Sequence, residues 1–412
     1  MRWALLGDSP STLPLLRSIL RRPAHELTAL ALSPKMHQTL RGEFSRVHLA
    51  SGWEPLLADP RIQAVIVAEG TEETLHAARQ LAAAGKSLLV SPRAGLSPTF
   101  AYELALLQND HALCLAPMFV GRGHPGWRHV RKLLAQGALG KILHVRIDRY
   151  GAPLAPSQRA PRLPPEEVFV AFLCDCDLLR TLWGDHNQVT AVCSGDPLEG
   201  FSLVTVTLEG PAVPQVVWSV TAAADAFWRM TIVGEQGTAQ VTGNPEHEPF
   251  RLKGTAIDPG QSGDLPFDWG DWLCDSFAAQ VAALPGEAPA SGPDQTAESI
   301  AGATWGEFVR SVELLEGVQR SLKKKRMIEI HFDPPSERGQ FKTQMTAAGC
   351  SLLMLTLLAT IAYLTLNPLL GGYSGFRQAL VALIFLPLGL FLLLQLLYFV
   401  ARPRENHPGS SG

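Results

Sequence analysis

Short apolar segments alternate with amphipathic stretches along residues 1–120 of the chain. The apolar segments are predicted strands, at residues 3–6, 27–32, 64–68 and 87–90. Apolar positions at helical spacing lie between and after them, at residues 11–21, 53–58, 72–84 and 97–108. Strands that are apolar throughout and separated by helices are typical of a parallel sheet covered on both faces. We therefore predict a doubly wound α/β domain over residues 1–120.

The pattern changes after this domain, where strand-like segments follow one another without regular helical crossovers. They lie at residues 142–149, 189–193, 203–208, 214–221, 228–233 and 239–241. Helical spacing marks residues 126–136, 168–182 and 298–321. Strands joined without crossover helices favour antiparallel pairing. We therefore expect a mostly antiparallel α+β domain over residues 121–330.

Two long apolar runs occupy the last part of the chain, at residues 345–366 and 378–400, and neither contains a Lys, Arg, Asp or Glu. A helix needs roughly 20 apolar residues to cross the hydrocarbon core of a bilayer. A pair of buried core helices is the alternative, but such helices are rarely apolar on every face. We therefore predict a two-helix transmembrane hairpin at residues 345–400, after a linker at 331–344 and before a tail at 401–412.

The charges that flank the two runs predict the orientation of this hairpin. Four basic residues at 323–326 precede the first run, and Arg402 and Arg404 follow the second, whereas the connecting loop holds only Arg377. Positive charge favours the cytoplasmic side of a membrane. We therefore expect a multi-pass protein of a bacterial-type inner membrane, with its body and both termini cytoplasmic and membrane lipid as a partner.

Composition excludes several classes of function. The formal net charge is −3 over 412 residues, so the chain lacks the basic excess of a nucleic-acid-binding protein. Its six cysteines show no paired CxxC spacing, so they predict no disulfide framework. Cys174 and Cys176 lie two residues apart, but no matching pair of His or Cys follows them. We therefore expect no metal site.

Five local strings resemble, in order and spacing over residues 1–330, motifs of the Gfo/Idh/MocA family. They are WEPLLADPRIQAVIVA at 53–68, LAAAGKSLLV at 81–90, VRKLLAQGALGKI at 130–142, DLLRTLWG at 177–184 and IVGEQGT at 232–238. Members of that family are NAD(P)-dependent dehydrogenases of sugars, inositols and related polyols. The resemblance implies a Rossmann-type dinucleotide-binding-like domain first and a family-like α+β domain second, whose open sheet forms homo-oligomers. The two apolar runs lie outside it.

The phosphate loop of the family, GxGxxG after the first strand, reads GDSPST at residues 7–12 here, so only Gly7 remains. Two interpretations stay open. One is an altered phosphate site that uses Ser9, Ser11 and Thr12; the other is an ordinary helix start capped by Asp8 or Ser11. Ser33 follows the second predicted strand and Gly70 follows the third, and both are candidate cofactor-binding residues. For Ser33, the alternative is a surface turn without a role in binding.

The catalytic positions implied by the resemblance are mostly changed. The family's lysine aligns with Pro92, which can neither transfer a proton nor donate a hydrogen bond. Its neighbour Arg93 stays protonated and makes a poor base. The family's histidine aligns with Cys174, while the aspartate that follows is kept as Asp177. Cys174, Asp177 and Arg93 are therefore the candidate catalytic residues, and Arg122 is either a further active-site residue or part of an exposed turn.

Two hypotheses of function follow. The protein is either an active NAD(P)-dependent dehydrogenase of a sugar, polyol or sugar nucleotide, or a relative whose catalysis is degenerate. The second would keep the fold as a scaffold or as a sensor of a nucleotide or sugar-like ligand. Loss of the loop glycines, the lysine and the histidine together favours the second, because hydride transfer depends on cofactor placement and a matched acid/base.

Overall fold

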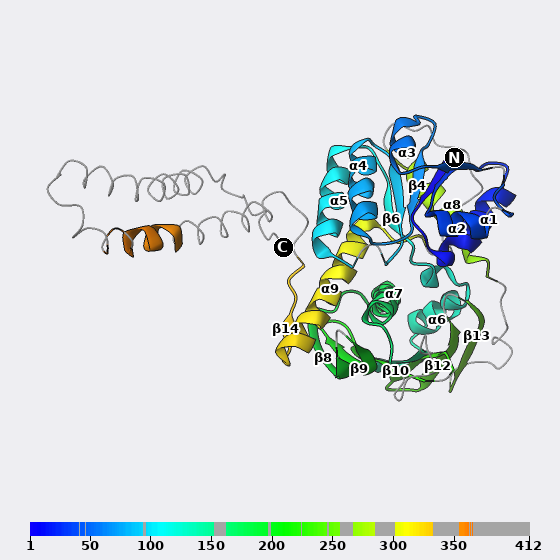
Figure 1. Ribbon diagram of the computed structural model, residues 1–412. Coiled ribbons are helices and arrows are strands. Elements are labelled where there is room, and N and C mark those ends of the chain that lie inside the picture. Colours follow the sequence, from blue (N-terminus) through cyan, green and yellow to red (C-terminus); the bar gives the residue numbers. More distant parts are fainter. Residues whose placement is uncertain are drawn as a thin grey trace, which may run out of the picture. The chain divides into compact units, whose positions relative to one another are not determined.

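Two β-sheets organise the protein in the computed structural model (Figure 1). The structure describes residues 1–332, apart from 41, 46, 94–95, 152–161, 197–198, 224, 245–246, 256–266 and 285–300, together with 354–361, 363 and 365. Both sheets lie within one unit, Met1–Phe332. The division of this unit near residue 120 stays a prediction.

The first sheet has six strands, all parallel, in the order β3-β2-β1-β4-β5-β6. The strands are β1 Arg2–Leu6, β2 Glu26–Ala31, β3 His48–Ala50, β4 Ala64–Val67, β5 Ser87–Val90 and β6 Leu115–Pro117. The order reverses between β1 and β4, as in Rossmann-type sheets, so the predicted doubly wound domain is confirmed. The sequence pattern missed β3 and β6, which have three residues each.

Helices cover both faces of this sheet. They are η1 Pro10–Thr12, α1 Leu13–Arg21, α2 Pro34–Leu40, α3 Glu54–Ala58, α4 Glu72–Ala83 and α5 Pro98–Asp110. Alternate residues of a strand point to opposite faces. Trp3 and Leu5 of β1 accordingly pack with α1, whereas Ala4 and Leu6 pack with α4 and α5. The fully apolar strands are thus explained by burial on two sides.

A further helix, α8 at Trp269–Ala282, returns from late in the chain to the first sheet and packs against α1. Asp268 caps it by accepting a hydrogen bond from the backbone N–H of Asp271 at 3.0 Å. Gly270 lies so close to α1 that a Cβ atom there would be 2.7 Å from the carbonyl oxygen of Pro14. Trp269 and Trp272, in the first turn of α8, are half-buried and pack against the apolar cluster that includes α1.

The second sheet has eight strands in the order β13-β12-β11-β7-β10-β9-β8-β14. They are β7 Ile142–Gly151, β8 Gln188–Asp196, β9 Gly200–Glu209, β10 Gln215–Ala222, β11 Phe227–Gly234, β12 Thr238–Asn244, β13 His247–Gly254 and β14 Ile328–Glu329. All neighbours are antiparallel except β7 and β10. The predicted, mostly antiparallel sheet is confirmed; oligomer formation through it stays a prediction.

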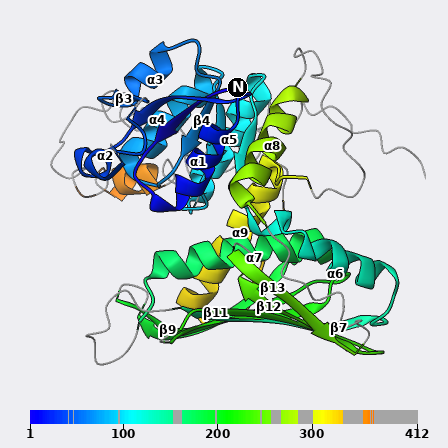
Figure 2. The same cartoon turned by 90° about the vertical axis from the view of Figure 1, so that its right-hand side faces the viewer.

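Helices α6 Gly126–Ala135 and α7 Pro165–Trp183 lie along one face of the second sheet (Figure 2). Helix α9, Trp305–Lys324, begins with a capping box formed by Thr304 and Glu307. It packs on β8 and also on α5 of the first sheet, where the Trp305 indole donates a hydrogen bond to the carbonyl oxygen of Ala101 at 2.9 Å. This helix therefore fastens the two sheets together.

The predicted transmembrane hairpin requires a correction. Within the two apolar runs the structure describes only residues 354–361, 363 and 365, all of them helical. No helix among the described residues is long and apolar enough to span a bilayer. The rest of the hairpin, with most of the linker and the whole tail, lies outside the described residues. The predicted multi-pass localisation rested on this hairpin and is wrong with it. Membrane lipid as a partner stays a prediction.

Candidate functional site

A pocket of about 330 Å³ lies at the carboxyl ends of β1, β2 and β4, where Rossmann-type sheets bind their ligands. Its lining residues are Leu6, Gly7, Asp8, Ala31, Leu32, Ser33, Ser51, Gly52, Trp53, Glu69, Thr71, Glu73 and Thr74. Gly7 and Ser33, two of the candidate cofactor-binding residues, therefore meet here. We call this pocket the crevice.

Gly7 adopts a positive φ of 94°, and its backbone N–H donates to the carbonyl oxygen of Ala31 at 3.0 Å. A Cβ atom at this position would lie only 2.7 Å from Cγ of Glu69. In a dinucleotide-binding loop, glycine leaves space for the backbone to approach the pyrophosphate. Here the Glu69 side chain fills the space beside Gly7.

Two carboxylates accept hydrogen bonds from the backbone around this loop. Glu69 accepts one from the backbone N–H of Asp8 and another from the Thr74 side chain. Asp8 Oδ1 accepts one from the backbone N–H of Ser33 at 2.8 Å. Burial, and then the neighbouring Asp8 carboxylate, raise the pKa of Glu69. The amides at the ends of β1 and β2 therefore already have anionic partners supplied by the protein.

The hydroxyl groups of the loop bond within the loop. Ser9 Oγ and Ser11 Oγ lie 2.7 Å apart, and Thr12 Oγ1 donates to the carbonyl oxygen of Ser9 at 2.7 Å. Ser9 and Thr12 are buried. Neither η1 nor α1 has a side-chain cap, so the alternative in which Asp8 or Ser11 caps the helix is wrong. Gly70 is exposed beside Glu69.

These residues do not fit the pyrophosphate of a dinucleotide. Three carboxylates line the crevice, from Asp8, Glu69 and Glu73, and its lining residues include no Lys or Arg. Two like charges 4 Å apart repel by about 4 kcal/mol at the effective dielectric constant of a protein surface. Pro10 and Pro14 also remove two backbone donors from the first turns, where phosphate would bind.

Pro92 and Arg93 follow β5. Pro92 is buried, whereas Arg93 forms ion pairs with Glu166 at 3.0 Å and Glu167 at 2.6 Å, both in the first turn of α7. Burial lowers the pKa of Arg93, but Glu167 and Glu166 outweigh it and raise the pKa overall. A guanidinium held in two ion pairs fastens this loop to α7 and is a poor proton acceptor.

Asp177 is sealed inside the protein by Arg122. Arg122 Nε lies 2.7 Å from Asp177 Oδ2, and its Nη2 bonds the other carboxylate oxygen. Arg122 is 4% exposed and Asp177 1%. Burial raises the pKa of Asp177, and Arg122 opposes that rise. Glu307 adds a second carboxylate 3.3 Å from Arg122 Nη1. Arg122 is therefore not part of an exposed turn, whereas its role as an active-site residue stays a prediction. It forms a buried ionic link between η2 (Gly121–Gly123), α7 and α9.

The structure brings only part of the predicted catalytic set together. Cys174 is half-buried one helical turn before Asp177 on α7, so the two share a face of this helix. Arg93 instead reaches the first turn of α7, at Glu166 and Glu167. About ten residues separate that turn from Asp177, which is roughly 15 Å along a helix.

Sequence reasoning missed a second buried carboxylate, Asp175. It is fully buried and accepts hydrogen bonds from Arg149 at 2.5 and 2.8 Å and from the indoles of Trp218 at 2.7 Å and Trp228 at 3.0 Å. An Asp within the apolar stretch of α7 was the available signal. It also missed Glu69, which directly follows an apolar strand. No His, Cys, Asp and Glu cluster suited to a metal is found among the described residues.

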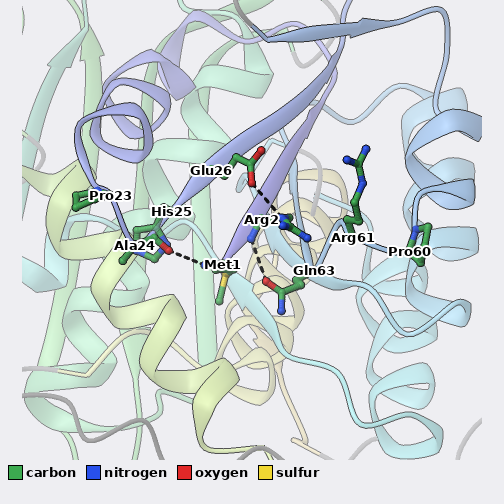
Figure 3. A pocket seen from close by; sticks show the side chains of 9 residues that line it. All are labelled: Met1, Arg2, Pro23, Ala24, His25, Glu26, Pro60, Arg61 and Gln63. Atoms are coloured by element: carbon green, nitrogen blue, oxygen red, sulfur yellow. Dashed lines mark hydrogen bonds and ion pairs between the residues drawn. The ribbon is translucent and has the colours of Figure 1, made fainter.

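A second pocket, of about 620 Å³, lies at the other end of the strands of the first sheet, by the amino ends of β1, β2 and β4 (Figure 3). Several of its polar groups are paired with one another. Met1 donates to the carbonyl oxygen of Ala24 at 2.7 Å, and Arg2 bonds Glu26 and Gln63, each at 3.0 Å. Ligands of such sheets bind at the carboxyl ends of the strands, so the crevice remains the candidate site.

A doubly wound parallel sheet followed by a mostly antiparallel, open sheet defines a Rossmann-type fold with a second sheet. Residues 127–240 match the family model for the GFO/IDH/MocA C-terminal domain. An uncharacterized oxidoreductase from Synechocystis sp. is 34% identical over 208 residues, which cover 45% of this chain and 56% of that protein. The chain is therefore similar to oxidoreductase-like proteins of the Gfo/Idh/MocA family, and it spans about half the length of this relative.

Solved structures share the fold. The WlbA dehydrogenase from Bordetella pertussis, in complex with NADH and UDP-GlcNAcA, has a TM-score of 0.63 at 18% identity, covering 81% of this chain and 98% of its own. Levoglucosan dehydrogenase, in complex with NADH and L-sorbose, has a TM-score of 0.59 at 14% identity, covering 80% and 99%. Identities this low establish the fold alone. The Rossmann-like dehydrogenase fold predicted from sequence is thereby confirmed.

Proposed function

We propose that this protein is a Gfo/Idh/MocA-family member that has lost hydride transfer and keeps its fold as a scaffold or as a sensor of a sugar-like ligand. The observation that carries the proposal is the state of the catalytic positions. Pro92 stands at the lysine position, and the retained Asp177 is closed in a buried ion pair with Arg122.

Oxidation of an alcohol needs a group that accepts the hydroxyl proton as the hydride leaves. Such a group must reach the substrate and exchange its proton near neutral pH. Pro92 has no proton to exchange, and Arg93 is held protonated by Glu167 and Glu166. Asp177 is 1% exposed and already accepts two hydrogen bonds from Arg122. These three positions therefore favour loss of the reaction.

An active NAD(P)-dependent dehydrogenase is the second candidate. Structures with this fold, such as the WlbA and levoglucosan dehydrogenases, hold NADH, which supports NAD or NADP as the cofactor class of the family. The half-buried Cys174 would then be the remaining acid/base in this chain. This alternative therefore depends on one thiol, and it makes a sharp prediction about that thiol.

The test is a turnover assay on the full chain. NAD⁺ or NADP⁺ is supplied with a panel of sugars, polyols and sugar nucleotides, and formation of reduced nicotinamide is followed by its fluorescence. Cys174→Ala is assayed beside the wild type as the matched control. We expect no turnover from either protein. Turnover by the wild type would overturn the proposal and establish the dehydrogenase, and its disappearance in Cys174→Ala would identify Cys174 as the acid/base.

Ligand sensing is measured separately, by thermal unfolding of the full chain with each sugar of the panel. A ligand present at about 100 times its Kd stabilises the folded state by about 2.7 kcal/mol. A sensor therefore shows a clear rise in Tm with at least one phosphate-free sugar. A scaffold without a ligand shows no rise with any of them.

A further inference from the structure

We infer that Glu69 and Asp8 determine the specificity of the crevice, because their carboxylates take the place of a dinucleotide's pyrophosphate. This inference rests on the proposed function only in treating the crevice as that of a family member. It concerns binding, whereas the proposed function concerns turnover.

The Glu69 side chain contacts Gly7 closely. Gly7 is the single glycine that remains in the loop, and its Cα faces the Glu69 side chain closely enough that a Cβ atom would lie 2.7 Å from Cγ. Glu69 follows β4, the strand next to β1 in the sheet. The side chain thus occupies, from the neighbouring strand, the space that a glycine here would otherwise leave for phosphate.

The backbone donors around this loop already have acceptors within the protein. Anions bind at such loops through backbone N–H groups aimed at them. The N–H of Asp8 donates to Glu69, and the N–H of Gly7 donates to Ala31. The N–H of Ser33, at the end of β2, donates to Asp8 Oδ1. The donors of this edge are therefore directed at groups of the protein itself.

The crevice also carries negative charge. The lining residues of the crevice include the carboxylates of Asp8, Glu69 and Glu73 and no Lys or Arg. A bound pyrophosphate would have to displace one carboxylate from its donors and face the other two. A phosphate-free compound that fills the same space meets no such repulsion, so the exclusion is directed at phosphate.

The test is calorimetric titration of NADH into the full chain and into its Glu69→Ala variant. Removing the side chain opens the space beside Gly7, frees the Asp8 N–H and removes one negative charge. We expect no saturable binding of NADH to the wild type. The variant should bind NADH with an affinity at least about tenfold above the highest affinity that the wild-type titration still allows, which corresponds to about 1.4 kcal/mol. Glu69→Thr, with a short side chain, should also gain affinity and serves if Glu69→Ala does not fold.

Glu72→Ala is the matched control. Glu72 is also a glutamate and lies exposed at the start of α4, but it does not line the crevice, so it reports the effect of net charge alone. Adenosine is titrated in parallel because it shares the nucleoside of NADH but carries no phosphate. Its affinity should not change in Glu69→Ala.

Three results would overturn the inference: micromolar NADH binding to the wild type, no gain in either Glu69 variant when both melt cooperatively, or an equal gain for Glu72→Ala or for adenosine. None of these results concerns turnover. NADH binding by the Glu69→Ala variant without turnover would support this inference and leave the proposed function standing. Turnover by the wild type would overturn the proposed function instead.

Discussion

Replacing Asp177 by asparagine should destabilise the protein strongly, because Arg122 would keep its charge and lose its main partner. Both side chains are buried, and Arg122 bonds both carboxylate oxygens of Asp177. Asparagine has nearly the same volume as aspartate, so the change creates no cavity. The loss of stability would therefore report the cost of the unpaired buried charge and not a change in packing.

The magnitude follows from the surroundings of Arg122. Removing one partner of a buried ion pair costs about 3–5 kcal/mol. Glu307 remains 3.3 Å from Arg122 and its side chain is 32% exposed, so it compensates in part and places the loss near 3 kcal/mol. Unfolding entropy is about 2.1 cal/mol/K per residue. For a unit of the size of Met1–Phe332, the expected fall in Tm is therefore about 4 °C.

The assay is thermal unfolding followed by circular dichroism, with two companion variants. Glu26→Gln breaks the exposed ion pair with Arg2, and should cost less than about 1 kcal/mol. A double variant, Arg122→Met with Asp177→Leu, replaces the pair by apolar side chains and should melt above Asp177→Asn. If Asp177→Asn melted like the wild type but abolished a dehydrogenase activity, Asp177 would be catalytic and the structural interpretation would be wrong.

Three further predictions concern other parts of the molecule. Gly234→Ala should lower Tm sharply because its Cβ would lie 2.1 Å from a backbone carbonyl oxygen, whereas Gly306→Ala, with open space around it in α9, should stabilise the protein by up to about 1 kcal/mol. Iodoacetamide at about pH 8 should label the exposed Cys193 in the folded protein but not Cys274, since burial raises the pKa of Cys274 to about 12; equal labelling rates would contradict this. Burial lowers the pKa of His186, so as the pH falls the imidazole is protonated in the unfolded state before it is protonated in the folded state. The free energy of unfolding should therefore fall as the pH drops below about 6.5. Denaturant unfolding of His186→Gln should lack the part of this fall that comes from His186.

The strands of the first sheet could be predicted because burial on both faces leaves a plain signal, a run of apolar residues. β4, Ala64–Val67, is buried at every position. β3 and β6 could not, because three residues are too short for a period to show. α8 was missed for another reason. Its first turn holds two tryptophans, and its apolar positions show no clear helical spacing in the sequence. Its packing on α1 becomes apparent only in the fold.

The candidate site could be predicted only in part. Gly7 and Asp177 could be found from sequence because each belongs to a short motif whose positions are neighbours in the chain. The partners that decide their roles lie far away in the chain. Arg122 and Asp177 are 55 residues apart, and Glu69 reaches Gly7 from the neighbouring strand. Only the fold brings such residues into contact, so sequence could name the changed positions without showing what had replaced the lost chemistry.

We propose that this fold no longer holds a nicotinamide dinucleotide for hydride transfer. Titration of NADH into the full wild-type chain tests it most directly. The structure predicts no saturable heat up to about 1 mM, because the Glu69 and Asp8 carboxylates face the phosphate position. Saturable binding with a Kd near 1 μM, about 8 kcal/mol of binding free energy, would contradict the account.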